Sequence, residues 1–274
     1  MLYSHGNNIS DANDSIAVIA EMIVPESKVL DVGCGAGDLG RVLSGKNCSL
    51  WGIEYDAENA SSSEKSGKYE KVYRLNLNDF QIDDVSEKFD YVVCADVLEH
   101  LMNPDDVVAK LKSKLNDGGH FIISVPNVSH ASIKTNLLLN DWSYTELGIM
   151  DKTHLRFFTA KSLAELLSRQ NLAAADCKVT TLPVDGYQPH RLKELPKEVA
   201  DFVMNDVYSE VFQFIVSAHS TTDSQRDIRR VNEEHICSMQ KNKYDGGKFF
   251  FEIKRLLLLK FPKLINFIQK LRQK

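Results

Sequence analysis

The chain has 274 residues, of which 43% are hydrophobic and 26% are charged, so it holds ample apolar material for one large globular core. No stretch approaches the roughly 18–20 uninterrupted apolar residues of a membrane-spanning helix, and the polar N-terminus shows no secretion signal. The five cysteines form no Cys-x-x-Cys pair and are typical of a reduced, cytoplasmic protein.

The net charge of −5 is distributed unevenly along the chain. Residues 241–274 contain ten of the 33 basic residues and two of the 38 acidic ones, which leaves 23 basic and 36 acidic residues elsewhere. An enzyme that acts on nucleic acid would carry positive charge along its active-site face. The acidic body therefore predicts a small-molecule or saccharide substrate and no nucleic-acid partner.

Short apolar runs alternate with helix-like segments over the first two-thirds of the chain, which predicts a mostly parallel α/β sheet. Asp14 can cap a first helix over 15–23. Further helices are expected over 38–44 and 105–115. Strands are expected over 28–32, 50–54, 70–75, 89–94 and 120–125.

The alternation breaks after Pro126. A first insertion without a strand covers 127–159, and Thr159 can cap a helix over 161–170. A strand over 177–181, a second insertion over 184–210 and a last strand over 211–218 follow. Insertions of this length in α/β enzymes usually carry function. The predicted organisation is one domain over 1–219, a polar linker over 220–240 and a basic amphipathic helical tail over 241–274.

A glycine-rich loop, Asp31-Val32-Gly33-Cys34-Gly35-Ala36-Gly37, directly follows the first predicted strand. Glycine tolerates a tight strand-to-helix turn and lets a ligand lie against the backbone, and the next helix adds amide donors. Glu54 ends the second strand, where an acid can accept hydrogen bonds from both hydroxyls of a ribose. The stretch 35–40 also matches the dinucleotide pattern of three glycines. An NAD-dependent oxidoreductase or a non-catalytic nucleotide-binding module therefore remains an alternative.

Four successive segments resemble the motifs of class I S-adenosylmethionine-dependent methyltransferases: VLDVGCGAGDLG (29–40), GIEYD (52–56), FDYVVCADVLEHLMNPDDVV (89–108) and LNDGGHFIISVPN (115–127). The resemblance implies a Rossmann-like sheet of seven strands, mostly parallel, with helices on both faces, insertions that cap the substrate and a C-terminal helical tail. It also implies that the last strand is antiparallel, whereas a dinucleotide enzyme would usually keep it parallel. The direction of strand 211–218 therefore discriminates between the two classes.

The same resemblance implies which residues bind S-adenosylmethionine. Asp31 would orient the loop, and Glu54, with Tyr55 beside it, would hold the ribose. The methionine part would meet Gly33, Cys34, Gly35 and Gly37 in the loop and Ala95, Asp96 and Val97 after the fourth strand. The adenine would meet Asn76, Leu77, Asn78 and Asp79. The alternatives are that Asp31 only satisfies loop amides, that Glu54 is an ordinary surface acid and that Cys34 is a packing residue.

An oxygen nucleophile usually needs a base to accept its proton, and histidine suits that task near neutral pH. His154, in the first insertion, is the first candidate for this base, and His100 is the second. The stretch 124–159 resembles bacterial methyltransferases of surface-polysaccharide, O-antigen or capsule biosynthesis, which implies a sugar, sugar-nucleotide or polysaccharide acceptor. Arg156 would then steer an anionic group of the acceptor. The acceptor pocket would be lined by Asn127, Trp142 and Tyr144.

Other interpretations of these residues stay open. His100 can brace the following helix, His154 and Arg156 can tie the insertion to the sheet, and Trp142 can belong to the core. No spacing of acids and histidines indicates a metal site. A quinone or antibiotic precursor, methylated on oxygen or nitrogen, is the alternative acceptor.

The segment 247–274 alternates apolar clusters with Lys and Arg. Such a segment can lie in a membrane interface, where its basic groups meet anionic lipid. It can equally dock on the acidic body or on a second subunit of a homodimer. The expected location is the cytoplasm, either free or peripheral to the inner face of the membrane.

Overall fold

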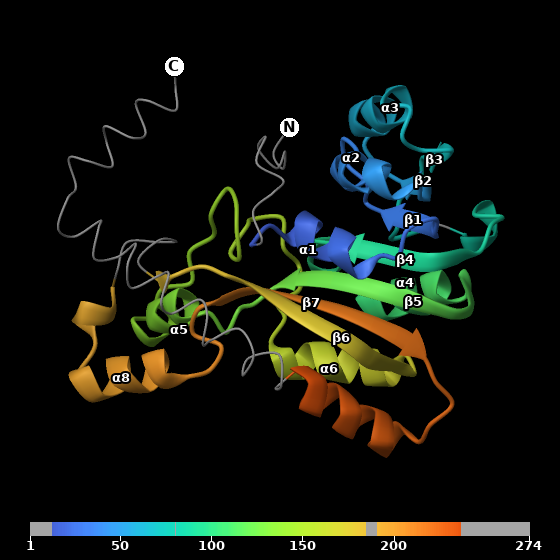
Figure 1. Ribbon diagram of the computed structural model, residues 1–274. Helices are drawn as coiled ribbons and strands as arrows, with labels where there is room; N and C mark the ends of the chain where they lie inside the picture. Colours follow the sequence, from blue (N-terminus) through green and yellow to red (C-terminus); the bar gives the residue numbers. More distant parts are fainter. Residues whose placement is uncertain (1–12, 80, 185–190, 237–274) are drawn as a thin grey trace.

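The computed structural model describes residues 13–79, 81–184 and 191–236. These residues form three layers, with a seven-stranded sheet between two sets of helices (Figure 1). The central strands are buried along almost their whole length, as expected for parallel strands that helices cover on both faces.

The sheet has the strand order β3-β2-β1-β4-β5-β7-β6. Strands β1 to β5 are parallel to one another, and β7 lies antiparallel between β5 and β6. This confirms the predicted Rossmann-like sheet with its antiparallel last strand. The strands are β1 (Lys28–Val32), β2 (Ser49–Ile53), β3 (Lys71–Tyr73), β4 (Phe89–Ala95), β5 (Leu115–Pro126), β6 (Leu172–Thr181) and β7 (Val211–Ser220).

The helices divide the core into two main clusters, one on each face of the sheet. One face is covered by α1 (Ser15–Met22), α2 (Asp38–Leu43) and α3 (Ala57–Lys65), and the other by α4 (Pro104–Lys112) and α6 (Ala160–Arg169). The predicted caps are confirmed, because the Asp14 side chain accepts from the first amides of α1 and Thr159 forms a capping box with Ser162 on α6. Away from the sheet lie α5 (Ala131–Leu138) and α8 (Lys197–Asn205), which belong to the two insertions (Figure 1).

Short 3-10 turns also occur among the described residues: η1 (Ser44–Lys46), η2 (Ile82–Asp84), η3 (Leu98–His100) and η4 (Leu192–Glu194). The helices α3 and α5 were not predicted from the sequence. The predicted start of β5 at residue 120 is five residues late, because Asn116-Asp117-Gly118-Gly119 is typical of a helix end. Leu115 pairs instead with Phe89 of β4, and a shift in register between Phe89 and Tyr91 accommodates the extra polar residues of β5.

The predicted linker over 220–240 is wrong for most of its described part, because residues 225–236 are helical. This helix, orange-red in Figure 1, lies beside α6, and its Ile228 and Ile236 are buried. The fully buried Asn232 accepts from the Ala174 amide (2.7 Å) and donates to the Leu172 carbonyl (2.9 Å) and the Ser168 hydroxyl (3.1 Å). The packed domain therefore extends beyond residue 219. The predicted tail over 241–274 lies outside the described residues.

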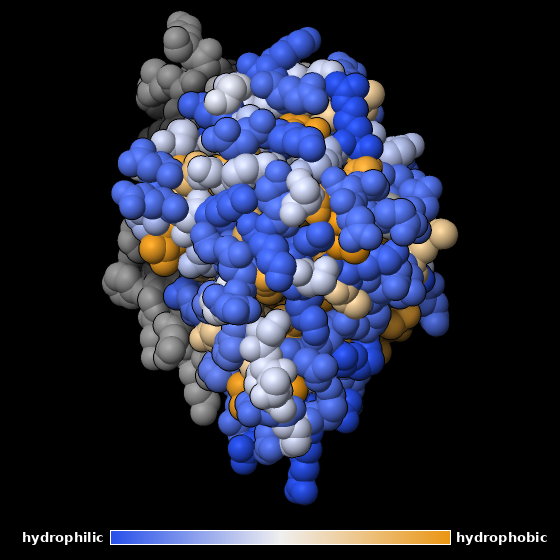
Figure 2. All heavy atoms as spheres, turned by 90° about the vertical axis from the view of Figure 1, so that its right-hand side faces the viewer, coloured by the Kyte–Doolittle hydropathy of each residue, from blue (hydrophilic) through white to orange (hydrophobic). Residues whose placement is uncertain are grey.

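None of the helices that the structure describes has the length and apolar character needed to cross a membrane. Figure 2 views the side at which β7 ends, and this face is mainly hydrophilic with scattered apolar side chains. Among the described residues, the exposed large apolar side chains of the first insertion are Leu137, Leu138, Trp142, Tyr144, Leu147 and Leu155.

Candidate functional site

The glycine loop joins β1 to α2 and is held by the end of β2. The amides of Gly33 and Cys34 both donate to the carbonyl of Ile53, at 2.8 and 3.0 Å. Gly33 and Gly35 have φ values of 71° and 53°, in the left-handed region that favours glycine. A Cβ atom at Gly33 would lie 2.7 Å from a methyl group of Val97, whereas one at Gly35 would meet nothing within 4 Å. The loop is therefore closed against the segment after β4 at Gly33 and open at Gly35, where a ligand can approach the backbone.

Glu54 links this open part of the loop to the start of α3. Its half-buried carboxylate accepts from the amide of Gly35 at 2.8 Å and from the amide of Asp56 at 2.7 Å. A carboxylate can accept further hydrogen bonds on the lone pairs that remain. Its position thus fits the predicted role at a ribose, whereas Tyr55 is largely exposed.

Asp31 acts on the loop through Tyr69, a residue that the sequence analysis did not identify. The Tyr69 hydroxyl donates to the buried Asp31 carboxylate (2.6 Å) and accepts from the amide of Gly40 in α2 (3.3 Å). Burial raises the pKa of Asp31 to about 7, and the negative charges of Glu54 and Asp38 add to the rise, while the Tyr69 hydrogen bond opposes it. The Tyr69 ring also lies against Gly40, where a Cβ atom would come within 2.7 Å of it.

Two other loop residues pack against α3 and its neighbours. The Cys34 side chain is buried beside Gly52 and Ser63, and burial raises the pKa of its thiol. This environment supports the packing interpretation of Cys34, whose backbone alone can then face a cofactor. Gly37 has a φ of 92°, and a Cβ atom there would lie 3.2 Å from both Ser63 and Tyr69.

The predicted adenine segment is joined to the segment after β4. The Asn78 side chain accepts from the amide of Met102 at 3.0 Å, and Asn76 accepts from the amides of Asn78 and Asp79. Leu77 is half-buried, and Asn76, Asn78 and Asp79 are exposed. The adenine contact of these residues stays a prediction.

Asp96 follows β4 with a φ of 53°, unusual for a residue with a side chain. Its carboxylate accepts from the Gln213 amide, with both oxygens 2.8 Å from the nitrogen, and from the Ser124 hydroxyl at 3.0 Å. These bonds fix the bend that separates the half-buried Ala95 from the buried Val97. The predicted contact of Ala95, Asp96 and Val97 with the cofactor stays a prediction.

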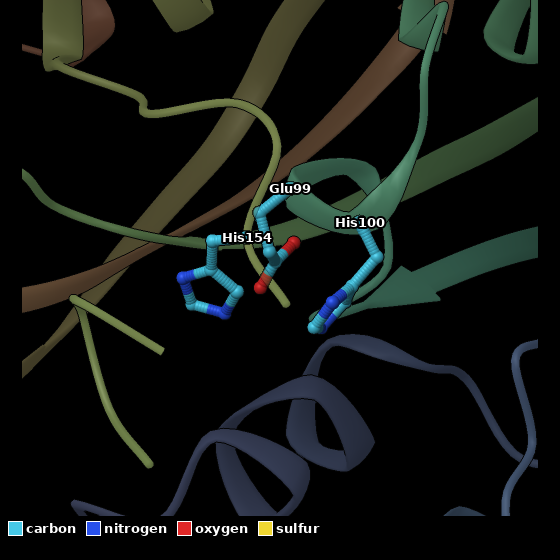
Figure 3. Close-up of side chains that lie close together, drawn as sticks. All are labelled: Glu99, His100 and His154. Atoms are coloured by element: carbon cyan, nitrogen blue, oxygen red, sulfur yellow. The ribbon is translucent and has the colours of Figure 1, made fainter. Parts of the chain in front are cut away.

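Beyond Val97, η3 and the first insertion bring three potential ligands together. Figure 3 shows the carboxylate of Glu99 between the imidazole rings of His100 and His154. The ring centroids of the two histidines are 4.8 Å apart, and one potential ligand atom from each of the three residues lies within 4.8 Å of the others. The Glu99 carbonyl accepts from the amides of Leu155 (2.7 Å) and Arg156 (3.0 Å), which fixes the insertion against η3. This triad was not predicted from the sequence, because His154 lies more than 50 residues along the chain from the other two.

Glu99 is the least satisfied polar side chain of this triad. It is 1% exposed, and neither of its carboxylate oxygens has a hydrogen-bond partner among the described residues. Burial raises its pKa well above the usual value, and the negative charges of Asp96 and Asp151 add to the rise, while its own backbone amide opposes it.

Hydrogen bonds assign the tautomers of both histidines. Nδ1 of His154 lies 2.9 Å from the carbonyl of Ile149, so it carries the proton and Nε2 carries the lone pair. Nδ1 of His100 lies 3.3 Å from the carbonyl and 3.1 Å from the hydroxyl of Thr153, and that hydroxyl donates to Asp151. Nδ1 of His100 therefore also carries its proton. Burial lowers the pKa of both imidazoles, and the neighbouring His154 lowers that of His100 further.

Aromatic side chains of the first insertion lie beside His154 of this triad. The ring of Phe157 lies 6.4 Å from that of His154, 5.3 Å from that of Trp142 and 6.4 Å from that of Tyr144. Trp142 and Tyr144 are 42% and 51% exposed, so their faces are accessible. The exposed Arg156 donates to the carbonyls of Leu155 and Met102 at the edge of the same region.

Asn127 does not line this region, and its predicted role in acceptor binding is wrong. Its side chain is fully buried, donates to the carbonyls of Tyr208 (3.2 Å) and Val211 (2.8 Å), and accepts from the amide of Ser129 (2.9 Å). All its donors are used within the fold, because it joins the end of β5 to the start of β7.

Comparison with known proteins identifies the family of the chain. A family model described as a methyltransferase domain matches residues 5–176, more than half of the chain. Two curated relatives are ubiquinone biosynthesis O-methyltransferases. That of Glaesserella parasuis serovar 5 is 33% identical over 111 residues, covering 36% of this chain and 45% of the relative. That of Haemophilus ducreyi is 28% identical over 175 residues, covering 61% and 71%. The chain thus spans about half the length of the first relative and 71% of the second.

A solved structure shares the fold at low sequence identity. It is the O-methyltransferase of a trans-AT PKS multienzyme of Brevibacillus brevis in complex with S-adenosyl-L-homocysteine, with a TM-score of 0.51 and 17% identity over 79% of this chain and 78% of that one. The antiparallel β7, the open glycine loop with Glu54 and the matching family model lead to one conclusion. The chain belongs to the methyltransferase-domain family and is an S-adenosylmethionine-dependent methyltransferase.

Proposed function

We propose that the protein methylates a hydroxyl group of a small acceptor that binds between η3 and the first insertion. The observation that carries this proposal is the arrangement of His100 and His154, each protonated on Nδ1 and each with its lone pair on Nε2. Val97, three residues before His100, lies against Gly33 of the glycine loop, so the histidines follow directly on a segment that would bind the cofactor.

The chemistry explains why such groups are needed. S-adenosylmethionine supplies an electrophilic methyl group, whose bond to sulfur breaks as the bond to the acceptor oxygen forms. The hydroxyl proton must leave in the same reaction, and a neutral imidazole within hydrogen-bond reach can accept it. His154 is the better candidate for this base, because the Ile149 carbonyl fixes its tautomer and orientation. Glu54 and the backbone at Gly35 would hold the cofactor on the other side.

The acceptor proposed first is a sugar, a sugar nucleotide or a polysaccharide intermediate. The accessible faces of Trp142 and Tyr144 suit the stacking of a sugar ring, and the exposed Arg156 suits a phosphate or carboxylate on the acceptor. A quinol is the second candidate, because the curated relatives carry the name ubiquinone biosynthesis O-methyltransferase and the same aromatic faces suit a planar ring.

Methyl transfer from S-adenosylmethionine to two acceptor panels, sugar nucleotides and catechol-type quinols, tests the proposal. Turnover of one panel identifies the acceptor class, and turnover of neither, by a protein that binds S-adenosylhomocysteine, contradicts both classes. His154→Ala should lower kcat on the active panel by about 10²-fold and leave the affinity for S-adenosylhomocysteine nearly unchanged. His120→Ala is the matched control. His120 lies on β5 outside the triad, and the centroid of its ring is 6.2 Å from that of His219 on β7.

A further inference from the structure

The triad of Glu99, His100 and His154 has a feature that the role of a general base leaves unexplained. A base needs one imidazole, yet two imidazoles converge here on a buried carboxylate without a hydrogen-bond partner among the described residues (Figure 3). Burying an unpaired carboxyl group is costly, and proteins usually satisfy it with a hydrogen bond, a cation or a metal ion. The fold nevertheless fixes Glu99 in this position, since its backbone carbonyl accepts from two amides of the insertion.

We propose that Glu99, His100 and His154 form a binding site for a divalent metal cation. Two imidazole nitrogens and one carboxylate make a donor set that binds Zn²⁺, Co²⁺, Fe²⁺ or Mn²⁺, whereas Mg²⁺ and Ca²⁺ prefer oxygen ligands alone. The three potential ligand atoms lie within 4.8 Å of one another, so small side-chain rotations can bring them to a common ion. The cation would supply a positively charged partner for the buried carboxylate of Glu99.

The groups around the triad are those that orient metal ligands. A metal-binding histidine generally donates its other ring N–H to a carbonyl or a carboxylate, which directs the lone pair of the remaining nitrogen at the ion. Nδ1 of His154 makes this bond to Ile149. For His100 the connection runs through the Thr153 hydroxyl to the buried Asp151, whose carboxylate accepts from that hydroxyl at 2.6 Å. Both Nε2 atoms therefore carry a lone pair for a ligand bond.

The consequence for catalysis rests on the proposed function. Three protein ligands leave coordination positions for acceptor oxygens. A hydroxyl group bound there would lose its proton to solvent at a lower pH than in water, because the cation stabilises the alkoxide. The two histidines would then act as ligands, and the acceptor would be placed by the same triad that activates it.

Metal binding can be measured without cofactor or acceptor, which separates this proposal from the proposed function. The full-length protein, stripped with a chelator and then freed of it, is titrated with Zn²⁺ in a calorimeter and with Co²⁺ in an absorption spectrometer. We expect one saturable site and the visible bands of Co²⁺ bound to nitrogen ligands. Glu99→Gln and His154→Asn should each weaken binding at least tenfold, the loss that removing even an outer-shell partner causes.

Glu99→Gln keeps the shape of a side chain that has no described partner, and His154→Asn keeps a donor for the Ile149 carbonyl, so both variants should fold. Circular dichroism checks this, and His120→Ala should bind metal like the unmodified protein. The absence of saturable binding, or binding that survives both substitutions unchanged, would overturn the metal site. Full methyl-transfer activity of a metal-free protein would refute the catalytic role while leaving the proposed function intact.

Discussion

The buried carboxyl group of Asp31 should make the folded protein less stable as the pH rises from 5 to 8. Burial raises its folded-state pKa to about 7 from the ordinary 3.8, so the native state binds the proton more tightly than the unfolded chain does. Between these two values the native state holds more protons, and stability therefore falls as the pH rises. The full difference, at about 1.4 kcal/mol per unit of pKa, corresponds to about 4 kcal/mol.

Asp31→Asn removes this titration and retains an oxygen that can accept from the Tyr69 hydroxyl. Within the accessible window of pH 5 to 8, the free energy of unfolding of the unmodified protein should fall by about 2–3 kcal/mol relative to that of the variant. Urea denaturation of both proteins at several pH values measures this difference. Asp117→Asn, the same substitution at an exposed position near the start of β5, serves as the control. Parallel stability curves for Asp31→Asn and the unmodified protein would refute the idea that this carboxyl group is buried at the loop.

Three further predictions test other parts of the structure. Gly35→Ala should lower the free energy of unfolding by about 1 kcal/mol, because only the φ of this residue is unfavourable for alanine. The same variant should bind S-adenosylhomocysteine at least tenfold more weakly in calorimetry. Gly33→Ala should lower the free energy of unfolding by about 1–3 kcal/mol more, because its Cβ atom collides with Val97. Equal stability of the two variants would contradict the packing of the loop. Asn232→Ala should lower the free energy of urea unfolding by about 2 kcal/mol or more, because the Ala174 amide loses its acceptor. Arg229→Ala, on the same helix, removes an exposed ion pair with Glu165 and should lower it by less than about 1 kcal/mol. Trp142→Ala should raise KM for the acceptor several-fold with the cofactor affinity unchanged, and an unchanged KM in steady-state kinetics would exclude Trp142 from the acceptor site.

The predictable part of this protein is the part that local sequence determines. A strand, a glycine loop and a helix follow one another within a dozen residues, and the acid at the end of β2 lies at a fixed distance along the chain. The left-handed glycines and the bond from the Gly35 amide to Glu54 are therefore consequences of a short segment.

The remaining features depend on contacts between segments far apart in the chain. Tyr69, which follows α3, donates a hydrogen bond to Asp31. The side-chain amide of Asn127 donates to two carbonyls near the start of β7, more than 80 residues away along the chain. Asn232 is buried only because its helix lies on α6 and β6. The proximity of Glu99 and His154 likewise arises from the path of the first insertion, which no spacing in the sequence reveals.

The affinity of the purified protein for S-adenosylhomocysteine, measured by calorimetric titration beside a titration with NAD, tests the central claim most directly. We expect micromolar binding of S-adenosylhomocysteine alone, weakened about 10- to 100-fold by Glu54→Gln, because a charged acceptor of ribose hydrogen bonds is lost. Binding of NAD alone, or of neither molecule by a folded sample, would contradict the assignment of this loop to S-adenosylmethionine.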